Sequence, residues 1–548
     1  MTFKSRICRC VTLAACLAAS SAAFGQGDWP SAGKDLNNSR YQDDEEKISV
    51  KTVAGLKLKW ATATDGDVTA NPAVEGNSLY FPDSAGFLYK LNKNTGAIIW
   101  KKPVSDFTGI AGDFARATPA IAGNALILGN QSGKFLQAFG QPAPKPARVF
   151  AVDKNTGAPL WTTEVDSTVM SFVTHSAIVA KGTALVGVAS NEEFVAGFVP
   201  KAFWQWNFRG SVVALDVKTG AIKWKTYTVP QGYYGGAVWG STGAVDLDRN
   251  VAYMATGNNY WVPDAVQNCI NAGGSPSACM SADNHFNSII ALDLTTGAIK
   301  WGARGLPYDA WNVGCGLNVP GLVIPPNDNC PNPKGPDWDF AQGPMLFNGS
   351  GGDSDDDHDK GKERGKGNKG GQLVGAGQKS GKFWAFNAKT GSLAWATQVA
   401  PGGLTGGLQW GSATDDKRIY VAVANSGLSG GGVNPEVWQL KDGSTTTSGG
   451  WAALNPKTGA VIWETKDPMG SRAEAAVSVA NNVVFGCNLE PGIGRMYALN
   501  AKTGAPLWSF AGAGACNAGP SIVDGMVFWG SGTFGFAPGP RLIHAFGL

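Results

Sequence analysis

The sequence of 548 residues predicts an all-β protein, an eight-bladed β-propeller whose ring is closed by strands from the two ends of the chain. Three observations lead to this prediction. The chain has 75 Gly, 30 Pro and 20 Trp but only 16% charged residues, a composition that suits many short strands joined by turns. A short motif ending in Trp recurs along the chain, and strands near the two termini supply one further unit.

The repeated motif reads "KTGAIKW" at residues 218–224. An alternating apolar strand such as "SVVALDV" precedes it, so each copy predicts a strand, a tight turn with Gly at positive φ, and a second strand that ends in Trp. We expect the Trp to pack against the next unit, where the turn Gly leaves room for its ring. The seven copies end at Trp100, Trp161, Trp224, Trp301, Trp395, Trp463 and Trp508.

Each unit of four strands cannot bury both of its faces alone, and radial stacking into a propeller solves this problem. An eighth unit is indicated by "LKLKW", which ends at Trp60, and by the C-terminal strand "RLIHAFGL". Pairing these two segments would remove exposed strand edges. We therefore predict one propeller over residues 27–548.

The repeats are most widely spaced from Trp224 to Trp301 and from Trp301 to Trp395, so long loops are expected there, where function usually lies. Residues 351–370 in the longest loop, "GGDSDDDHDKGKERGKGNKG", carry acidic and then basic residues and lack apolar ones. We expect a disordered insertion there. Its aspartates could instead bind a cation, but the Gly and distal Glu of a calcium loop are missing.

Residues 1–25 predict a secretory signal peptide, because a basic start is followed by an apolar stretch and then by small residues. The stretch "LAAC", ending at Cys16, resembles a lipoprotein cleavage box, but the apolar run before it is too short for a signal core. No later segment has the about 18 apolar residues that a transmembrane helix needs. We expect a periplasmic or secreted protein.

Six cysteines follow the predicted signal peptide, and an even number in an exported chain suggests disulfides. Spacing alone leaves the pairing open. Proximity favours Cys269 with Cys279 and Cys315 with Cys330, leaving Cys487 with Cys516. None of them lies in a CxxCH motif, which excludes covalently bound haem in this sequence.

The charge pattern excludes one class of partner. The net charge is +3, from 45 basic and 42 acidic residues, so the sequence shows no electrostatic footprint for nucleic acid.

The repeats, the predicted signal peptide and the stretch "WPSAGKDLNNSRY" at 29–41 together resemble the alcohol dehydrogenases that depend on pyrroloquinoline quinone (PQQ), in particular the polyvinyl-alcohol dehydrogenase branch. The resemblance covers nearly the whole chain after the signal peptide. The same Trp repeat also occurs in non-enzymatic relatives, so it supports the fold more strongly than the activity.

In this family a calcium ion bound to the quinone is held by a Glu, an Asn and a nearby Asp. The resemblance places Glu193 of "VASNEEF", Asn258 of "ATGNNYW" and Asp309 of "GLPYDAWNVGC" at these positions. Oxygen ligands of this kind suit Ca²⁺. Taken singly, the two acids could be ordinary loop residues and Asn258 a turn residue; their family order favours the metal site.

The resemblance also implies a quinone pocket. Trp239 of "AVWGS" would stack against the flat quinone. Arg116, Thr174 and Ser190 would bind its carboxylates and carbonyls. Lys379 stands where the family often has Arg beside the reactive carbonyls, and it lacks the guanidinium fork. The pair of adjacent cysteines that covers the quinone in many relatives is missing here.

These expectations define the leading hypothesis, a PQQ- and Ca²⁺-dependent dehydrogenase that oxidises primary or secondary alcohols or hydroxylated polymers of the polyvinyl-alcohol type. Asp309 would act as the base, and the metal with Lys379 would polarise the quinone carbonyl. Because the sequence has no haem motif, electrons would leave to an external cytochrome c. The alternatives are a propeller that serves binding or assembly without catalysis, and a hydrolase or sugar-binding propeller. The hydrolase lacks a Ser/His/Asp elbow and has only four histidines in the chain to draw on.

Overall fold

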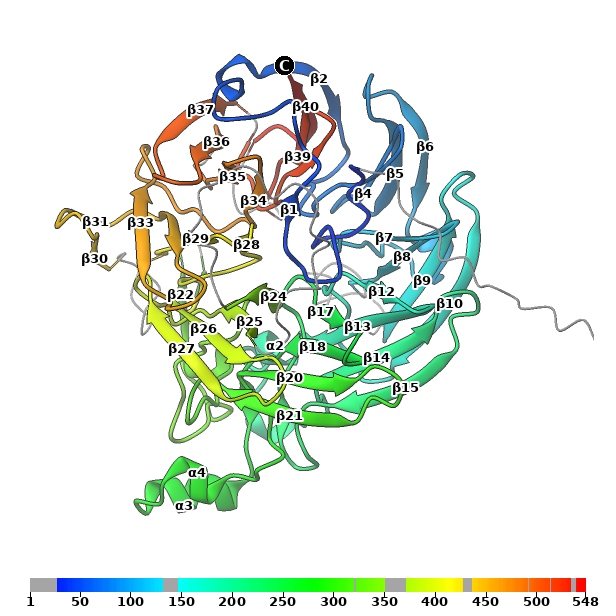
Figure 1. The fold of residues 1–548 in the computed structure, drawn as a ribbon. Helices are drawn as coiled ribbons and strands as arrows, with labels where there is room; N and C mark the ends of the chain where they lie inside the picture. The colour runs from blue at the N-terminus through cyan, green and yellow to red at the C-terminus, as the bar shows by residue number, and fades with distance from the viewer. Residues whose placement is uncertain are drawn as a thin grey trace, which may run out of the picture.

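The computed structural model describes residues 27–131, 146–319, 322–349, 371–426, 436–490, 492–512, 514–533 and 539–548. In this part of the chain, eight four-stranded antiparallel sheets stand around one axis, as Figure 1 shows. The predicted eight-bladed propeller is therefore confirmed. The predicted signal peptide at 1–25 and the predicted disordered insertion at 351–370 lie outside the described residues.

The first four blades follow one another along the chain, each running from the inner strand to the outer strand. Blade 1 contains β3 (Ala73–Glu75), β4 (Ser78–Pro82), β5 (Phe87–Asn92) and β6 (Ile98–Pro103). Blade 2 contains β7 (Ala120–Ala122), β8 (Ala125–Gly129), β9 (Ala147–Asp153) and β10 (Pro159–Asp166). Blade 3 contains β12 (Ile178–Ala180), β13 (Thr183–Ser190), β14 (Ser211–Asp216) and β15 (Ile222–Tyr227), with β11 (Ser171–Phe172) paired to β13. Blade 4 contains β17 (Ala244–Asp246), β18 (Val251–Ala255), β20 (Ser288–Asp293) and β21 (Ile299–Arg304).

The next three blades repeat this order. Blade 5 contains β24 (Met345–Asn348), β25 (Gln372–Gly377), β26 (Lys382–Asn387) and β27 (Leu393–Gln398). Blade 6 contains β28 (Ala413–Thr414), β29 (Ile419–Val423), β32 (Gly450–Leu454) and β33 (Val461–Lys466). Blade 7 contains β34 (Ser478–Ala480), β35 (Val483–Cys487), β36 (Arg495–Asn500) and β37 (Pro506–Ala511).

Blade 8 closes the ring from both ends of the chain. Its inner strands are β38 (Ser521–Val523), β39 (Met526–Gly530) and β40 (Leu542–Gly547), and its outer strand is β2 (Lys57–Ala63). β2 pairs with β40 in antiparallel register, with Lys57 opposite Gly547. The predicted closure by terminal strands is confirmed, and it leaves no break in the ring of sheets.

Short elements decorate the loops. The helices are α1 (Ser105–Thr108), α2 (Glu192–Val195), α3 (Asp264–Asn271) and α4 (Pro276–Cys279), and single 3₁₀ turns occur at Val53–Gly55, Lys201–Phe203 and Val313–Cys315. Three small ribbons pair β16 (Tyr234–Gly235) with β19 (Asn259–Trp261), β22 (Leu317–Val319) with β23 (Leu322–Ile324), and β30 (Trp438–Gln439) with β31 (Thr445–Thr446). No helix in the described ranges is long and apolar enough to cross a membrane.

The repeated Trp joins each blade to the next. Trp224 on β15 donates its Nε1 hydrogen to the Leu294 carbonyl of blade 4, 3.2 Å away, and its ring covers Gly297 of the next "TG" turn. Gly297 has φ of +75°, and a Cβ there would lie 2.5 Å from the ring. The predicted role of the turn Gly is confirmed. The same contact joins Trp60 to Gly96, Trp100 to Gly157, Trp161 to Gly220, Trp301 to Gly391, Trp395 to Gly459 and Trp463 to Gly504.

The last Trp completes the circle. Trp508 on β37 donates from Nε1 to the carbonyl of Leu56, 3.1 Å away, just before β2 of blade 8. A Thr two residues after the Trp often adds a second bond to the same turn, as Thr226 does to the carbonyl of Gly297 at 2.7 Å. The blades are therefore held together by paired hydrogen bonds as well as by apolar contact.

An N-terminal strap, residues 28–42, fills the middle of the ring, where Figure 1 draws it in dark blue. It ends in β1 (Tyr41–Gln42), which pairs with β34 in parallel. Main-chain hydrogen bonds join the strap to the inner strands of blades 1, 2, 4, 5, 6 and 7, at Val74, Ile121, Val245, Leu346, Thr414 and Val479. The strap therefore pairs with edges of inner strands that would otherwise face the axial channel.

The three predicted disulfides are confirmed. Cys269–Cys279 ties α3 to α4, Cys315–Cys330 closes the loop that contains β22 and β23, and Cys487–Cys516 joins blade 7 to the segment before blade 8. Two of them stabilise the long loops that interrupt the repeat.

We predict that Trp224→Ala lowers the free energy of unfolding by about 3 to 5 kcal/mol, because a buried aromatic side chain is removed from an interface between blades. Denaturant unfolding would measure the change. Lys218→Ala, on the exposed turn of the same hairpin, is the control and should be nearly neutral. Equal stability of the two variants would contradict the role of Trp224 between blades.

Candidate active site

Chain topology places the predicted site residues at one end of the propeller. In each antiparallel blade, the loops between the second and third strands and the loops that lead to the next blade emerge at the end opposite the "TG" turns. Glu193 lies in α2 after β13, Asn258 lies after β18, and Asp309 lies after β21. Trp239 precedes β17 and Lys379 lies between β25 and β26. Loops from blades 3, 4 and 5 therefore converge here.

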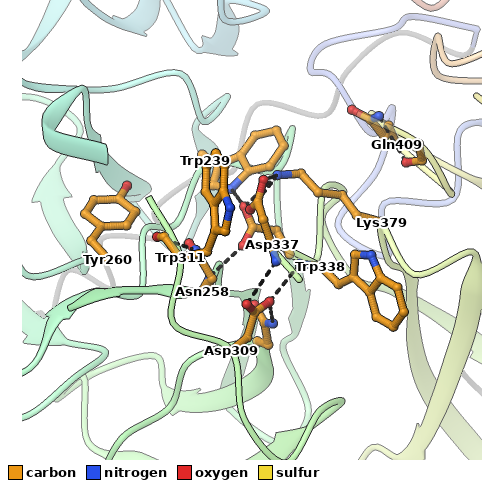
Figure 2. A network of polar contacts seen from close by, with 12 residues as sticks. Trp239, Asn258, Tyr260, Asp309, Trp311, Asp337, Trp338, Lys379 and Gln409 are labelled. Atoms are coloured by element: carbon orange, nitrogen blue, oxygen red, sulfur yellow. Dashed lines mark hydrogen bonds and ion pairs between the residues drawn. The ribbon is translucent and has the colours of Figure 1, made fainter. Parts of the chain in front are cut away.

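Asp309 is 1% exposed and fully supplied with hydrogen-bond donors. Its Oδ1 accepts from the backbone of Asp337 at 3.0 Å, and its Oδ2 accepts from the backbone of Trp338 at 2.7 Å and from Asn287 Nδ2 at 2.8 Å. Figure 2 shows the carboxylate of Asp309 facing the chain at Asp337 and Trp338. Asp309 thus fixes the loop that carries the next two acids.

Asp337 and Asp339 form the centre of the cluster, and the sequence analysis missed both. Lys379 Nζ lies 3.0 Å from Asp337 Oδ1 and 3.2 Å from Asp339 Oδ2. Asp339 also accepts from Trp239 Nε1 at 3.0 Å and from the backbone of Asn258 at 2.5 Å. Asp339 is therefore the residue that touches the predicted stacking Trp, the predicted Lys and the predicted metal-binding Asn.

A sequence signal for these acids exists in "GPDWDFAQ", where two Asp residues flank a Trp in a loop far from any repeat. The backbone of Asp337 has φ of +59°, a left-handed conformation that is uncommon for a residue other than Gly. Such strain persists where surrounding contacts hold it, and here Asp309 and Lys379 do so. The Asp-Trp-Asp sequence could have indicated these site residues, because it does not belong to the Trp repeat that forms the blades.

Electrostatics of the cluster are dominated by buried acids. Four carboxyl groups, of Glu193, Asp309, Asp337 and Asp339, surround one cation, Lys379. Burial raises the pKa of Asp309 to about 7, and burial together with the charge of Asp339 raises the pKa of Glu193 to about 8. Burial opposes the charge on Lys379, but Asp337 and Asp339 outweigh it and raise its pKa. Such an excess of acids favours binding of a further cation.

Two oxygens in the cluster fit a metal ion. Glu193 Oε1 and Asn258 Oδ1 are buried and find no hydrogen-bond partner among the described residues. Asn258 donates its Nδ2 hydrogen to the Trp311 carbonyl at 2.9 Å, which fixes the direction of its amide. Within the described ranges no three His, Cys, Asp or Glu side chains could hold a metal ion, and the amide oxygen of Asn258 is a further oxygen donor of the kind that suits Ca²⁺.

Trp239 fits a flat aromatic cofactor. Its Nε1 is bound by Asp339, and its ring meets Trp410 edge to face, with ring centroids 5.6 Å apart. Lys379 Nζ lies 5.3 Å from the centre of the Trp239 ring. The bond to Asp339 fixes the orientation of the indole, and a flat indole is the kind of surface on which a planar ligand stacks.

The predicted carboxylate-binding residues lie in two places. Arg116 and Thr174 line a cavity on the propeller axis together with Trp410, and the Arg116 guanidinium lies 4.7 Å from the centre of the Trp410 ring. Ser190 lies toward the acid cluster instead, where its Oγ accepts from the backbone of Glu192 at 3.1 Å. The Trp239–Trp410 contact joins the two regions.

We predict that Lys379→Met lowers the free energy of unfolding by about 3 to 5 kcal/mol, because Asp337 and Asp339 lose their buried cation. Asp337→Asn is the companion variant and should cost less, since Lys379 keeps Asp339. Denaturant unfolding without added metal would compare the two variants. A Lys379→Met protein as stable as the wild type would contradict this charge balance.

Among known families, a sequence profile described as "Outer membrane protein assembly factor BamB" matches residues 367–492 and 447–534. These ranges cover β25 to β27 of blade 5, blades 6 and 7, and β38 and β39 of blade 8. They contain Lys379, whereas Glu193, Asn258, Asp309 and Asp339 lie outside them. The match therefore describes the propeller repeat and does not include the acid cluster.

The polyvinylalcohol dehydrogenase of Sphingopyxis sp. (strain 113P3) is 28% identical over 540 residues, which span 92% of this chain and 73% of the relative. Among solved structures, the quinohemoprotein alcohol dehydrogenase ADHIIG of Pseudomonas putida HK5 is 19% identical with a TM-score of 0.66, over 95% of this chain and 80% of that one. A europium-containing methanol dehydrogenase is 17% identical with a TM-score of 0.65, over 95% of this chain and 98% of that one. These comparisons confirm the predicted relationship: the chain is a relative of the PQQ-dependent alcohol dehydrogenases, oxidoreductases that act on CH–OH groups.

Proposed function

We propose that this protein is a PQQ- and Ca²⁺-dependent alcohol dehydrogenase. The observation that carries the proposal is the buried cluster of four acids and Lys379 beside Trp239, in which Glu193 and Asn258 each leave one buried oxygen unpaired. A metal ion satisfies these oxygens and offsets the acid charge. The related europium-containing dehydrogenase has the same fold, so the identity of the metal is part of the proposal.

Different residues of the chain would bind the metal ion and the quinone. Glu193 and Asn258 would hold the metal, and Trp239 would support the flat face of PQQ. Lys379 would donate to a carbonyl oxygen, and Arg116, Thr174 and Ser190 would bind the remaining polar groups. When bound, the quinone accepts the hydrogen and electron pair released from the carbinol carbon.

The sequence predicts that Asp309 is the catalytic base and a metal ligand. The contacts in the structure favour Asp339 as the base instead. Both oxygens of Asp309 are already bound by amide donors that fix the following loop. The oxygens of Asp339 also accept hydrogen bonds, from the backbone of Asn258 and from Trp239 and Lys379, but of the two acids Asp339 is the one that contacts the proposed quinone-binding side chains Trp239 and Lys379. We propose that Asp339 accepts the hydroxyl proton of the substrate and that Asp309 positions it, with no direct role as metal ligand.

The wider function follows from the relatives. Alcohols, including hydroxylated polymers of the polyvinyl-alcohol type, are the proposed substrates, and an external cytochrome c is the proposed electron acceptor. The predicted signal peptide supports a periplasmic or secreted location. The alternative is a propeller without catalysis that serves binding or assembly, favoured by the profile match within residues 367–534.

We predict that Asp339→Asn lowers the turnover of alcohols by about 10² to 10⁴, the usual value of a general base, while PQQ still binds. Asp309→Asn keeps one of its two acceptor oxygens and loses part of the bonding that holds the loop, so it should lower turnover less. Dye reduction would measure turnover and absorbance would measure bound quinone. Normal turnover by Asp339→Asn would overturn this assignment, and a larger loss in Asp309→Asn would return the role of base to Asp309.

We also predict that Glu193→Gln and Asn258→Ala raise the Ca²⁺ concentration needed for half-maximal activity, because each removes a ligand charge or oxygen. Glu192→Gln is the matched control, since the Glu192 carboxylate accepts from the backbones of Asn207 and Phe208 instead. A calcium series with each variant gives the measurement. Wild-type protein that binds neither quinone nor metal would favour the non-catalytic alternative.

A further inference from the structure

A polar cavity of about 40 Å³ lies on the propeller axis, lined by the strap and by loops of several blades. The strap contributes Arg40, blade loops contribute Asn71, Arg116 and Thr174, and Trp410 forms part of the wall. A space of this size accommodates a few waters or one small charged group.

Buried donors without partners surround this cavity. Arg40 is fully buried, and its Nε and Nη1 find no hydrogen-bond partner among the described residues. Its remaining contact, from Nη2 to the carbonyl of Trp410, is long at 3.5 Å. The Nδ2 of Asn71 and the Oγ1 of Thr174 are also buried and unsatisfied within the described ranges. Unpaired buried donors of this kind are costly, and here they line one space.

Charge in the cavity is positive. Arg40 and Arg116 both line it, and burial lowers the pKa of Arg40 only to about 10, so its guanidinium is charged at neutral pH. Arg40 forms no ion pair with an acid among the described residues, and its Nε and Nη1 are unpaired. A buried guanidinium in this situation is strongly unfavourable unless an anion accompanies it.

We propose that this axial cavity binds a carboxylate-sized anion between Arg40 and Arg116. The anion has two possible sources with the same chemistry: a carboxylate of bound PQQ, in which case the inference rests on the proposed function, or a free small anion such as formate. Because Arg40 belongs to the strap, the anion would connect the strap to the blade loops. Arg40 is thereby a binding residue supplied by the segment that fills the channel.

The first experiment uses the protein without quinone. Thermal unfolding is followed in HEPES adjusted with tetramethylammonium hydroxide, with and without tetramethylammonium formate, for wild type, Arg40→Gln, Arg40→Lys and Arg304→Gln. Arg304 is a half-buried cation away from the cavity and serves as the control for charge loss. If a free anion occupies the site, formate raises the melting temperature of wild type and Arg40→Lys but not of Arg40→Gln.

The second experiment measures the affinity for PQQ by quenching of tryptophan fluorescence, which does not depend on turnover. If a quinone carboxylate occupies the cavity, Arg40→Gln weakens binding roughly tenfold or more, and Arg304→Gln leaves it nearly unchanged. Asn71→Ala, which leaves the strap intact, should weaken binding in the same direction and keeps the test open should Arg40→Gln fail to fold.

Each result of the two experiments either supports or contradicts the anion site. Dependence on Arg40 or Asn71 in either experiment supports the anion site and identifies its source, and failure of wild type to bind PQQ would count against the proposed function while leaving the formate experiment valid. Without formate or PQQ, Arg40→Gln should be at least as stable as wild type, because an uncompensated charge is removed. Independence of both the formate effect and PQQ affinity from Arg40 and Asn71 would overturn the proposal, whatever the stability of Arg40→Gln, and would leave Arg40 a purely structural residue.

Discussion

The contact between an outer-strand Trp and the turn Gly of the next blade is the interaction on which the rest of this structure depends. It requires a left-handed turn that leaves room for an indole ring, and the sequence supplies that turn in every "TG" copy. Because the contact repeats around the ring and Trp508 completes it at Leu56, each blade is positioned by its neighbours. A rigid ring of this kind allows loops at its opposite end to be long without loss of precision.

A ring also creates an axial channel bordered by inner strands, whose backbone groups need partners. The strap provides them by pairing with blades far apart in the sequence. Its path carries a polar residue, Arg40, into a space that apolar packing would otherwise fill. The strap therefore fills the axial channel and also places a charged side chain, Arg40, inside it.

The repeat made the fold predictable, because seven similar segments indicate both the strand pattern and the contact of each Trp with the next blade. The disulfides were predictable because the paired cysteines lie close together in the sequence. The site was predictable only in part. Glu193, Asn258, Trp239 and Lys379 do gather in one place, but Asp337 and Asp339 were missed because they belong to an irregular loop between β23 and β24. The contacts of Asp309 with that loop, and the burial of Arg40, depend on pairing between distant segments that local pattern does not reveal.

The two regions that meet at Trp239 and Trp410 differ in the sign of their charge. On one side, Glu193, Asp337 and Asp339 outnumber Lys379; on the other, Arg40 and Arg116 face the axis. Both sides are buried, so solvent screens this difference little. If the proposed ligand binds here with a metal ion at one end and carboxylates at the other, one orientation is favoured, because the reverse orientation would place like charges together at both ends. In that orientation the charge separation would direct the reactive end of the proposed ligand toward Lys379 and Asp339.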